Sequence, residues 1–413
     1  MYKAIDSCRV CGNASLTPIL DLGEQALTGV FPRHRDQDVE SGPLRLIKCQ
    51  GPKACGLVQL EHTFSLEAMY GENYGYRSGL NATMVKHLQS KVAAILARFE
   101  VRKGSLVLDI GSNDGTTLAS FPSSYERVGI DPAAAKFREF YEPGTLAIPD
   151  FFSEEVLRTH VGDRQASIVT SFAMFYDLED PMAFMRDIRN VLAPDGLWVF
   201  EQSYLPLMIE RNAYDTVCHE HLEYYSVSQV KWMTDQVGMK IIDVEFNDIN
   251  GGSFSVVAAQ GASDYDETPV LNAAIASEHE AGYDSLDVYG AFAERVEQSR
   301  SDLLSLFDEA HRSHQTIAAL GASTKGNVLL QYCGLTGRDI LGVGEINEDK
   351  FGAFTPGGYI PILPEEEILD MEPDYLLVLP WHFRETFRAK QTRGRSKLVF
   401  PLPELEVVTD SLR

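Results

Sequence analysis

Residues 214–226 hold a dense set of groups that can move protons or bind a metal. The segment reads YDTVCHEHLEYYS, with two histidines, three acids, one thiol and three tyrosines. Three interpretations are open. The first is a metal site formed by Cys218, His219 and His221. The second is a buried polar turn. The third is a histidine base that a carboxylate orients. The zinc-protease motif H-E-x-x-H is absent, because Glu223 stands at its last position.

A glycine-rich turn follows an apolar run at residues 106–115, LVLDIGSNDG. Gly111 and Gly115 allow a tight turn and a close approach to a ligand, where a Cβ would clash. The turn matches neither G-x-G-x-x-G nor a phosphate loop. Asp109 and Asp114 place negative charge where a pyrophosphate would lie, which disfavours a dinucleotide. A cationic ligand with hydroxyls, such as S-adenosylmethionine (SAM), fits better.

A second acid supports this ligand. Residues 127–132, RVGIDP, form a short strand signal ending in Asp131, about 20 residues after Asp109, a spacing that favours an acid on ribose hydroxyls. The pair of motifs resembles class I SAM-dependent methyltransferases. Ligands of such sheets bind beyond the carboxyl ends of the strands. We therefore expect the donor to contact Asp109, Gly111, Ser112, Asn113, Asp114, Gly115, Asp131, Pro132, Asp150, Phe151, Ser171 and Met174.

Length and composition describe a globular protein with no basic surface. The chain has 413 residues, 44% of them hydrophobic and 23% charged, which indicates two or three domains. Its formal charge of −24 argues against nucleic-acid binding. No apolar run is long enough for a membrane span, and the first residues lack a signal-peptide core, so we expect a cytoplasmic protein. It is expected to be a monomer or a small homo-oligomer.

Four of the six cysteines suggest a metal-stapled N-terminal domain. Cys8 and Cys11 form a C-x-x-C knuckle followed by glycine, and Cys49 and Cys55 form a wider pair. Clustered cysteines in a reducing compartment are typical of zinc sites, and four thiolates leave no open position for catalysis. We expect structural Zn²⁺. The alternative is four unrelated buried thiols, which the wide second pair keeps open.

The order of elements predicts an α/β protein in three parts. We expect a zinc-binding domain over residues 1–70, a class I methyltransferase core with a Rossmann-like sheet over residues 71–249, and a C-terminal Rossmann-like α/β domain over residues 250–413. The core strands are expected at 105–110, 127–130, 144–148, 167–171 and 196–201. Their alternation with helical patterns predicts a parallel sheet with helices on both faces.

Two further stretches suggest substrate contacts. Residues 70–81, YGENYGYRSGLN, are either a packed loop or a lid over the methyl donor, with Tyr74, Tyr76 and Arg77 offering phenols and a cation. In the C-terminal part, GASTKGN at 321–327 follows a strand and precedes a helix, which is typical of a phosphate seat. The alternative for Trp381 and its neighbours is core packing. The expected substrate contacts are Tyr74, Arg77, Tyr224, Asn250, Ser323, Lys325, Trp381 and His382.

The chain as a whole resembles the sugar C-methyltransferases that act on nucleotide-linked 4-keto-deoxysugars. The resemblance rests on CRVCG, CQGPKACGLVQL, YGYRSG, LDIGSNDG, CHEHLEYYS, NGGSF, GASTKGNVLL, PGGYIPI and LPWHF, in that order. It implies that the C-terminal domain helps to bind a nucleotide-diphosphate-linked keto sugar. One departure is that members often carry a histidine after the fourth core strand, where this chain reads FYDLEDP with Asp177.

The resemblance also implies a mechanism. A base removes the proton beside the ketone, and the enolate attacks the methyl group of SAM. His221 is then the candidate base, Glu220 and His219 orient it or bind the sugar, and Tyr76 donates to the keto oxygen. Two rival interpretations remain: a SAM-dependent methyltransferase of another small anionic metabolite, and a non-catalytic protein that binds SAM and zinc.

Overall fold

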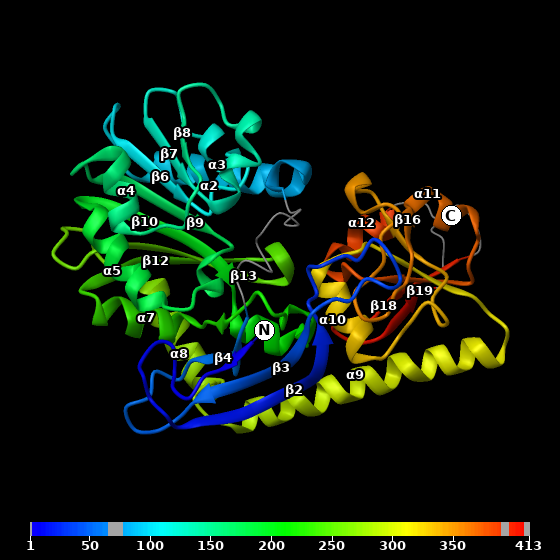
Figure 1. The fold of residues 1–413 in the computed structure, drawn as a ribbon. Coiled ribbons are helices and arrows are strands. Elements are labelled where there is room, and N and C mark those ends of the chain that lie inside the picture. Colours follow the sequence, from blue (N-terminus) through cyan, green and yellow to red (C-terminus); the bar gives the residue numbers. More distant parts are fainter. Residues whose placement is uncertain (1, 65–76, 390–395, 409–413) are drawn as a thin grey trace.

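The computed structural model describes residues 2–64, 77–389 and 396–408. Within these ranges the chain forms three main sheets, each at the centre of one lobe (Figure 1). The methyltransferase-like core, the N-terminal sheet and the C-terminal α/β domain meet around residues 205–226. None of the helices in these ranges combines the length and apolar composition that a membrane crossing requires.

The N-terminal lobe is a sheet with strand order β11-β4-β3-β2. Its long ladder pairs β2 (Leu16–Ala26) with β3 (Ser41–Cys49), and β4 (Val58–Leu60) follows. The fourth strand, β11 (Glu223–Tyr224), comes from the histidine-rich segment. The segment with the candidate base is therefore built into the N-terminal sheet. A small separate ladder joins β1 (Lys3–Ala4) to β5 (His62–Thr63).

The core is a seven-stranded sheet of order β12-β13-β10-β9-β6-β7-β8. Its parallel strands are β6 (Leu106–Ile110), β7 (Glu126–Ile130), β8 (Leu146–Ile148), β9 (Ala166–Phe172) and β10 (Leu192–Ser203). The antiparallel strand β13 (Ser253–Gln260) lies between β10 and β12 (Met239–Asn247).

This sheet corrects one detail of the sequence-based prediction. The sheet is mixed rather than fully parallel, because β13 enters as an antiparallel hairpin partner of β12. It also extends past the expected domain limit at residue 249, since β13 continues the same hydrogen-bonded sheet to Gln260. The five expected core strands are all present, with ends shifted by a few residues.

Capping residues fix where the core helices begin. The side chain of Asn81 accepts from the amides of Thr83 and Met84, and Asp180 accepts from Ala183 just before Pro181. The helices of this part are α2 (Ala82–Arg98), α3 (Thr116–Ala119), α4 (Glu154–Val161), α5 (Pro181–Val191), α6 (Leu205–Glu210), α7 (Val227–Gln236) and α8 (Pro269–Glu280).

The C-terminal lobe is a six-stranded sheet of order β16-β15-β14-β17-β18-β19. All neighbours are parallel except the last pair. The strands are β14 (Ile317–Leu320), β15 (Val343–Glu345), β16 (Ile362–Pro364), β17 (Tyr375–Val378), β18 (Lys397–Phe400) and β19 (Glu406–Val408). The helices are α9 (Asp287–Arg312), α10 (Thr324–Tyr332), α11 (Glu365–Asp370) and α12 (Arg384–Ala389).

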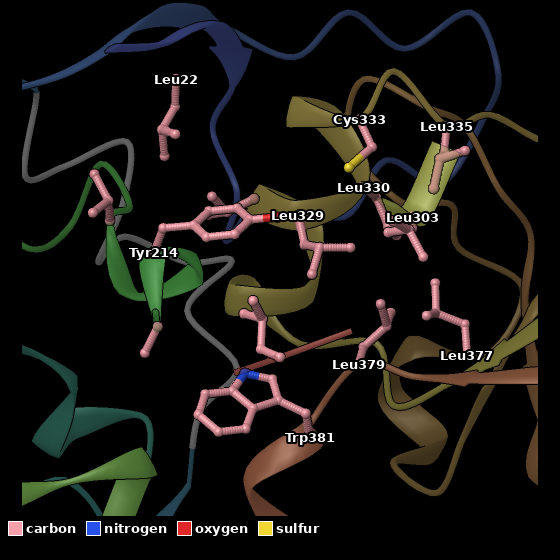
Figure 2. Close-up of a cluster of buried hydrophobic side chains, with 14 of the residues drawn as sticks. Leu22, Tyr214, Leu303, Leu329, Leu330, Cys333, Leu335, Leu377, Leu379 and Trp381 are labelled. Carbon is pink, nitrogen blue, oxygen red and sulfur yellow. The ribbon is translucent and has the colours of Figure 1, made fainter. Parts of the chain in front are cut away.

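One hydrophobic core joins the lobes. It contains Leu20 and Leu46 of the N-terminal sheet, Tyr214, Phe292 of α9 and Leu329 of α10. The long α9 runs beneath β2 and on to the C-terminal lobe (Figure 1). Figure 2 shows the ring of Tyr214 extending toward Leu329. Because burial of this apolar surface spans three lobes, it fixes their relative placement around the candidate site.

Candidate active site

The four N-terminal thiols converge as expected. The Sγ atoms of Cys8, Cys11, Cys49 and Cys55 all lie within 4.8 Å of one another. The contacts are 3.6 Å for Cys8 to Cys55 and 3.5 Å for Cys11 to Cys49. Four thiolates at about 2.3 Å from one Zn²⁺ would lie at similar separations, so the donor set fits a closed structural site. This is a zinc-binding domain with four cysteine ligands, and its site lies at one end of the β2–β3 ladder.

The glycine turn has the backbone geometry that a close ligand requires. Gly111 has φ +70 and Gly115 has φ +77, in the left-handed region. A Cβ on Gly111 would lie 3.0 Å from Cγ of Met174, so Met174 packs directly against the turn. The Ser112 hydroxyl pairs with the phenol of Tyr141 at 2.8 Å, and that phenol also bonds the carbonyl of Asn113. Ser112 therefore braces the turn from behind.

The two strand-end acids are buried beside this turn. Oδ1 of Asp109 accepts from the Thr170 hydroxyl at 2.5 Å, and burial raises the pKa of Asp109 to about 7. Oδ2 of Asp131 accepts from the amide of Asn113 at 2.9 Å, and Oδ1 accepts from the amide of Ala133 at 2.6 Å. Burial raises the pKa of Asp131 as well. Pro132 opens the 3₁₀ turn that follows.

These residues fit a bound SAM. The carboxylate of Asp131 is held at the sheet edge by two amides, and each oxygen keeps a lone pair for a ribose hydroxyl. A Cβ on Gly111 would crowd Met174 and narrow the space that the turn leaves for the ligand. Asp150 and Phe151 lie at the end of β8 and are exposed, which leaves the ring of Phe151 free to pack on an adenine. When bound, SAM supplies an electrophilic methyl group.

Ser171 has a structural role instead of the expected donor contact. It is fully buried, and its hydroxyl accepts from the indole N–H of Trp198 at 2.9 Å. The side chains of β9 alternate, so Ser171 faces the interior while Thr170 faces Asp109. At this strand end Thr170 therefore braces Asp109, and Met174 is the residue that packs against the glycine turn.

Arg77 and the two residues after it lie against the glycine turn. Nε of Arg77 is 3.4 Å from Oδ2 of Asp114, and its guanidinium lies 3.9 Å from the ring centre of Phe140. The amides of Ser78 and Gly79 donate to the side chains of the turn: Ser78 to Oδ1 of Asn113 at 3.0 Å and Gly79 to Oδ2 of Asp114 at 2.9 Å. This end of the expected lid thus contacts the glycine turn. Tyr74 and Tyr76 lie outside the described residues.

His221 is held as a neutral imidazole with a defined tautomer. Its Nδ1 lies 2.9 Å from the carbonyl oxygen of Thr216, which only accepts, so Nδ1 carries the proton and Nε2 keeps its lone pair. Tyr176 packs edge-on at 4.4 Å between ring centres. Burial, followed by the charge of Lys325, lowers the pKa of His221 to about 3. This geometry provides an oriented basic nitrogen.

Glu220 faces the N-terminal lobe. Its Oε2 lies 3.4 Å from the hydroxyl of Thr28. A Cβ built on Gly29 would lie 2.4 Å from Oε1, so only glycine leaves room for this carboxylate. Burial raises the pKa of Glu220. Thr28 and Gly29 carried no signal in the sequence, because neither belongs to a recognisable motif.

His219 points away from His221. Its Nε2 bonds the carbonyl of Gly42 at 3.3 Å, and its ring packs on Phe64 at 4.6 Å. It is fully buried, and burial lowers its pKa to about 4. The structure therefore gives His219 a packing role in place of the expected catalytic one. The cause is that residues 218–221 form a turn, so alternate side chains do not share a face.

The metal interpretation of the histidine segment is not supported. Within residues 2–64, 77–389 and 396–408, the N-terminal set of four cysteines is the one group of three or more potential ligands that converges. Cys218 is buried, and burial raises its pKa well above the ordinary value.

Lys325 reaches the histidine segment from the first turn of α10. Its Nζ donates to the carbonyl oxygen of Asn250 at 2.7 Å. Asn250 has φ +55, a left-handed conformation that directs this carbonyl at the ammonium group. Ser323 is the N-cap, because its hydroxyl accepts from the amide of Gly326 at 3.1 Å. The segment expected to bind a phosphate is therefore the capped start of α10, and its lysine points toward Asn250.

Asp215 is a candidate site residue to which the sequence pattern assigned no role of its own. It is 1% exposed, and its Oδ2 accepts from the indole N–H of Trp381 at 2.8 Å. Trp381 is itself buried, so it braces Asp215 rather than offering an open stacking surface. His382 lies beside it, and burial, followed by the charge of Lys325, lowers the pKa of His382 to about 3.

Tyr224 also supports the site from behind. It is buried, and its hydroxyl donates at 3.5 Å to the same Thr216 carbonyl that orients His221. It belongs to β11, which pairs with β4. The structure thus replaces the expected substrate contact of Tyr224 with a positioning one.

Comparison with known proteins decides the family. A C-methyltransferase C-terminal domain matches residues 248–403, a methyltransferase domain matches residues 84–244, and a zinc binding domain matches residues 8–70. The chain is 30% identical over 420 residues to C-methyltransferase NovU of Streptomyces niveus, and the match covers 99% of this chain and 98% of that protein. The chain belongs to this C-methyltransferase family. It is a SAM-dependent C-methyltransferase with a zinc-binding N-terminal domain.

Two solved structures resemble part of this C-methyltransferase. CcbJ methyltransferase from Streptomyces caelestis is 14% identical with a TM-score of 0.33, covering 42% of this chain and 90% of its own. Magnesium protoporphyrin IX methyltransferase from Synechocystis is 12% identical with a TM-score of 0.32, covering 43% and 79%.

Proposed function

We propose that this enzyme methylates the carbon beside the ketone of a nucleotide-diphosphate-linked keto-deoxysugar, with His221 as the base. The observation that carries the proposal is the tautomer of His221. Its Nδ1 proton is committed to the Thr216 carbonyl, so Nε2 is available to remove a proton. The relation to NovU, a C-methyltransferase that matches this chain along almost its whole length, supports the assignment of methylation to carbon.

The chain's own groups provide the other requirements of this reaction. The α proton of a ketone is acidic enough for an imidazole base when the enolate oxygen is stabilised. Glu220, the residue before the proposed base in the chain, has its carboxylate against Thr28 and Gly29, and we propose that it binds a sugar hydroxyl. Arg77 lies where a lid over the donor would begin. Tyr76, as a donor to the keto oxygen, stays a prediction.

The substrate class is tested by a thermal-shift panel. Purified enzyme with SAM is titrated with thymidine, guanosine, uridine, cytidine and adenosine diphosphates. One nucleotide is expected to raise the melting temperature by several degrees, because a ligand that binds only the folded state stabilises it. If SAM raises the melting temperature and no nucleotide adds to it, the enzyme methylates another small anionic metabolite instead.

The base is tested by His221→Ala. The variant should lose methyl transfer by a factor of about 10² or more, as removal of a general base typically does, with SAM affinity unchanged. Asn190→Ala is a suitable control on the exposed face of α5. Retention of turnover by His221→Ala would remove the base assignment, and loss of SAM binding would point to a folding defect.

A further inference from the structure

We propose that Lys325 is a catalytic residue that binds the oxygen of the enolate, with Asp215 as its charge partner. The inference rests on the function proposed above and gives that site its anion-stabilising group. It replaces the phosphate contact that the sequence motif suggested for this lysine.

The first argument is the direction of the side chain. The ammonium group reaches Asn250 in the loop between β12 and β13, at 2.7 Å from its carbonyl. Within the described residues this is the one hydrogen bond that Lys325 donates from its side chain, so the ammonium retains donors for a substrate oxygen. Ser323, which would share a phosphate, already uses its hydroxyl to cap α10.

The second argument is the buried acid nearby. Asp215 is 1% exposed, and its Oδ1 has no hydrogen-bond partner among the described residues. Its Oδ2 is fixed by Trp381. An unpaired buried carboxylate oxygen is costly unless a charge compensates it. Lys325 supplies that charge electrostatically. Burial raises the pKa of Asp215 and Lys325 is the largest cause opposing it, while burial lowers the pKa of Lys325 and Asp215 and then Cys218 oppose that effect.

The third argument is the match between base and cation. Four titratable groups from the elements around Lys325 interact electrostatically with it: Asp215, Cys218, His221 and His382. His221 is a weak base where it lies, because burial and the charge of Lys325 both lower its pKa. A weak base removes an α proton only if the enolate is stabilised to a similar degree. The cation that weakens the base also acidifies the ketone, so both act on one transition state.

The step balances without any further reagent. Nε2 of His221 takes the α proton, the C–H electron pair forms the C=C bond, and the carbonyl π pair moves to oxygen, which Lys325 binds. The enolate carbon then forms a bond to the methyl carbon of SAM, and the C–S electron pair stays on sulfur. The products are the C-methylated ketone, S-adenosylhomocysteine and a protonated histidine.

Solvent exchange isolates the proposed step. The enzyme with S-adenosylhomocysteine is mixed in D₂O with the thymidine or guanosine diphosphate ester of a 4-keto-6-deoxyhexose, and loss of the α-proton NMR signal is followed. Wild type should exchange the proton. Lys325→Gln should slow exchange at saturating substrate by a factor of about 10² or more, as loss of an oxyanion donor does. The dissociation constant of the nucleotide diphosphate alone should stay unchanged.

Controls separate the possible failures. Lys240→Gln removes another lysine that donates to a backbone carbonyl, at 2.7 Å from Ser263, and should exchange like wild type. Lys325→Arg should recover part of the rate. Weaker nucleotide binding with normal saturated exchange would overturn the inference in favour of a phosphate contact. Absence of exchange and methylation in wild type with either ester would instead overturn the proposed function.

A second variant tests the charge partner. Asp215→Asn keeps an acceptor for Trp381 but removes the negative charge that raises the pKa of Lys325. The lysine should then lose its proton at lower pH, so the alkaline fall of the exchange rate should begin at lower pH than in wild type. An unchanged alkaline limb would contradict the coupling of these two residues.

Discussion

Nε of Arg9 lies 3.8 Å from Oε1 of Glu223, and both side chains are almost fully buried, at 4% and 0% exposure. Arg9 follows the zinc ligand Cys8, and its guanidinium also donates to the carbonyl of Leu60 at 2.6 Å and the hydroxyl of Thr63 at 2.8 Å. Glu223 is the first residue of β11, two positions after His221. The pair therefore links the cysteine knuckle to the segment that carries His221.

Arg9→Gln should destabilise the enzyme by roughly 3 kcal/mol, because it removes a buried guanidinium that donates to Leu60 and Thr63 and offsets part of the burial that raises the pKa of Glu223. Denaturant unfolding measures the loss. Arg45→Gln is the matched control, since its contacts with Asp21 and Glu61 are largely solvated and should be worth less than about 1 kcal/mol. Equal losses in the two variants would show that the buried pair has no special weight.

Metal removal should disorder the same region. We expect about one zinc per chain from the four thiols. Chelation should increase hydrogen exchange of amides in residues 214–226 as well as abolish turnover, because β11 pairs with β4 of the zinc-binding domain. Protein purified without chelator that contains no metal would refute the zinc site. Fast exchange confined to residues 8–55 would refute the coupling.

Gly29→Ala should reduce methyl transfer about tenfold or more with little change in SAM affinity. The new Cβ would meet Oε1 of Glu220 at 2.4 Å and displace that carboxylate. Steady-state kinetics and calorimetry measure the two effects. Gly290→Ala is the control, because nothing lies within 4 Å of the new Cβ in α9 and the helix should gain about 0.5–1 kcal/mol.

The exchange rate should not fall at the pH at which an ordinary histidine takes up a proton. A base is active above its pKa, and the pKa of His221 is about 3 rather than 6.5. Saturated exchange should therefore remain constant as pH falls from 7 to 5. The charge of Lys325 is one of the two causes that lower the pKa of His221. In Lys325→Gln this cause is removed, so the acidic fall of the rate should move toward neutral pH. NMR titration of labelled histidine provides the direct check, and a wild-type midpoint near 6.5 would contradict the burial.

Asp131→Asn should weaken SAM binding about tenfold, equivalent to about 1.4 kcal/mol. The change keeps the shape but removes the charge that its two amide contacts and a ribose hydroxyl share. Isothermal calorimetry measures the affinity. Asp187→Asn, on α5, is the control because it also loses a carboxylate that accepts from a backbone amide, here that of Glu154. Similar losses in both variants would argue against a donor contact at Asp131.

Local patterns predicted the elements well and their mutual contacts less well. The strand–turn–helix around Gly111 and the cluster of four cysteines follow from short-range spacing, and both are present as expected. The opposite directions of His219 and His221 were not predictable, because a turn rather than a strand carries them. Antiparallel β13 was missed since its place in the sheet depends on pairing across the chain.

The roles of Lys325 and Trp381 show the same limit. The glycines and the capping serine around Lys325 indicate a loop before a helix, and that is correct. The direction of the lysine side chain depends on how α10 packs. Asn250 and Asp215 lie far away in the sequence, so the residues around Lys325 do not predict these partners. A tryptophan offers a large ring on which a base could stack. The indole N–H of Trp381 instead donates to a buried acid 166 residues earlier in the chain.

The contact between Asn327 and Thr28 has a consequence for how the enzyme is made. The amide of Asn327 donates to the Thr28 carbonyl at 2.8 Å across 299 residues, and Glu220 lies on the hydroxyl of the same threonine. During synthesis the N-terminal sheet must wait for α10 to emerge before this corner can close. The part of the site around Thr28 and Glu220 can therefore form only after α10 has been synthesised. An exchange of C-terminal domains between relatives should therefore keep an amide donor at position 327, because the acceptor on residue 28 is a backbone carbonyl.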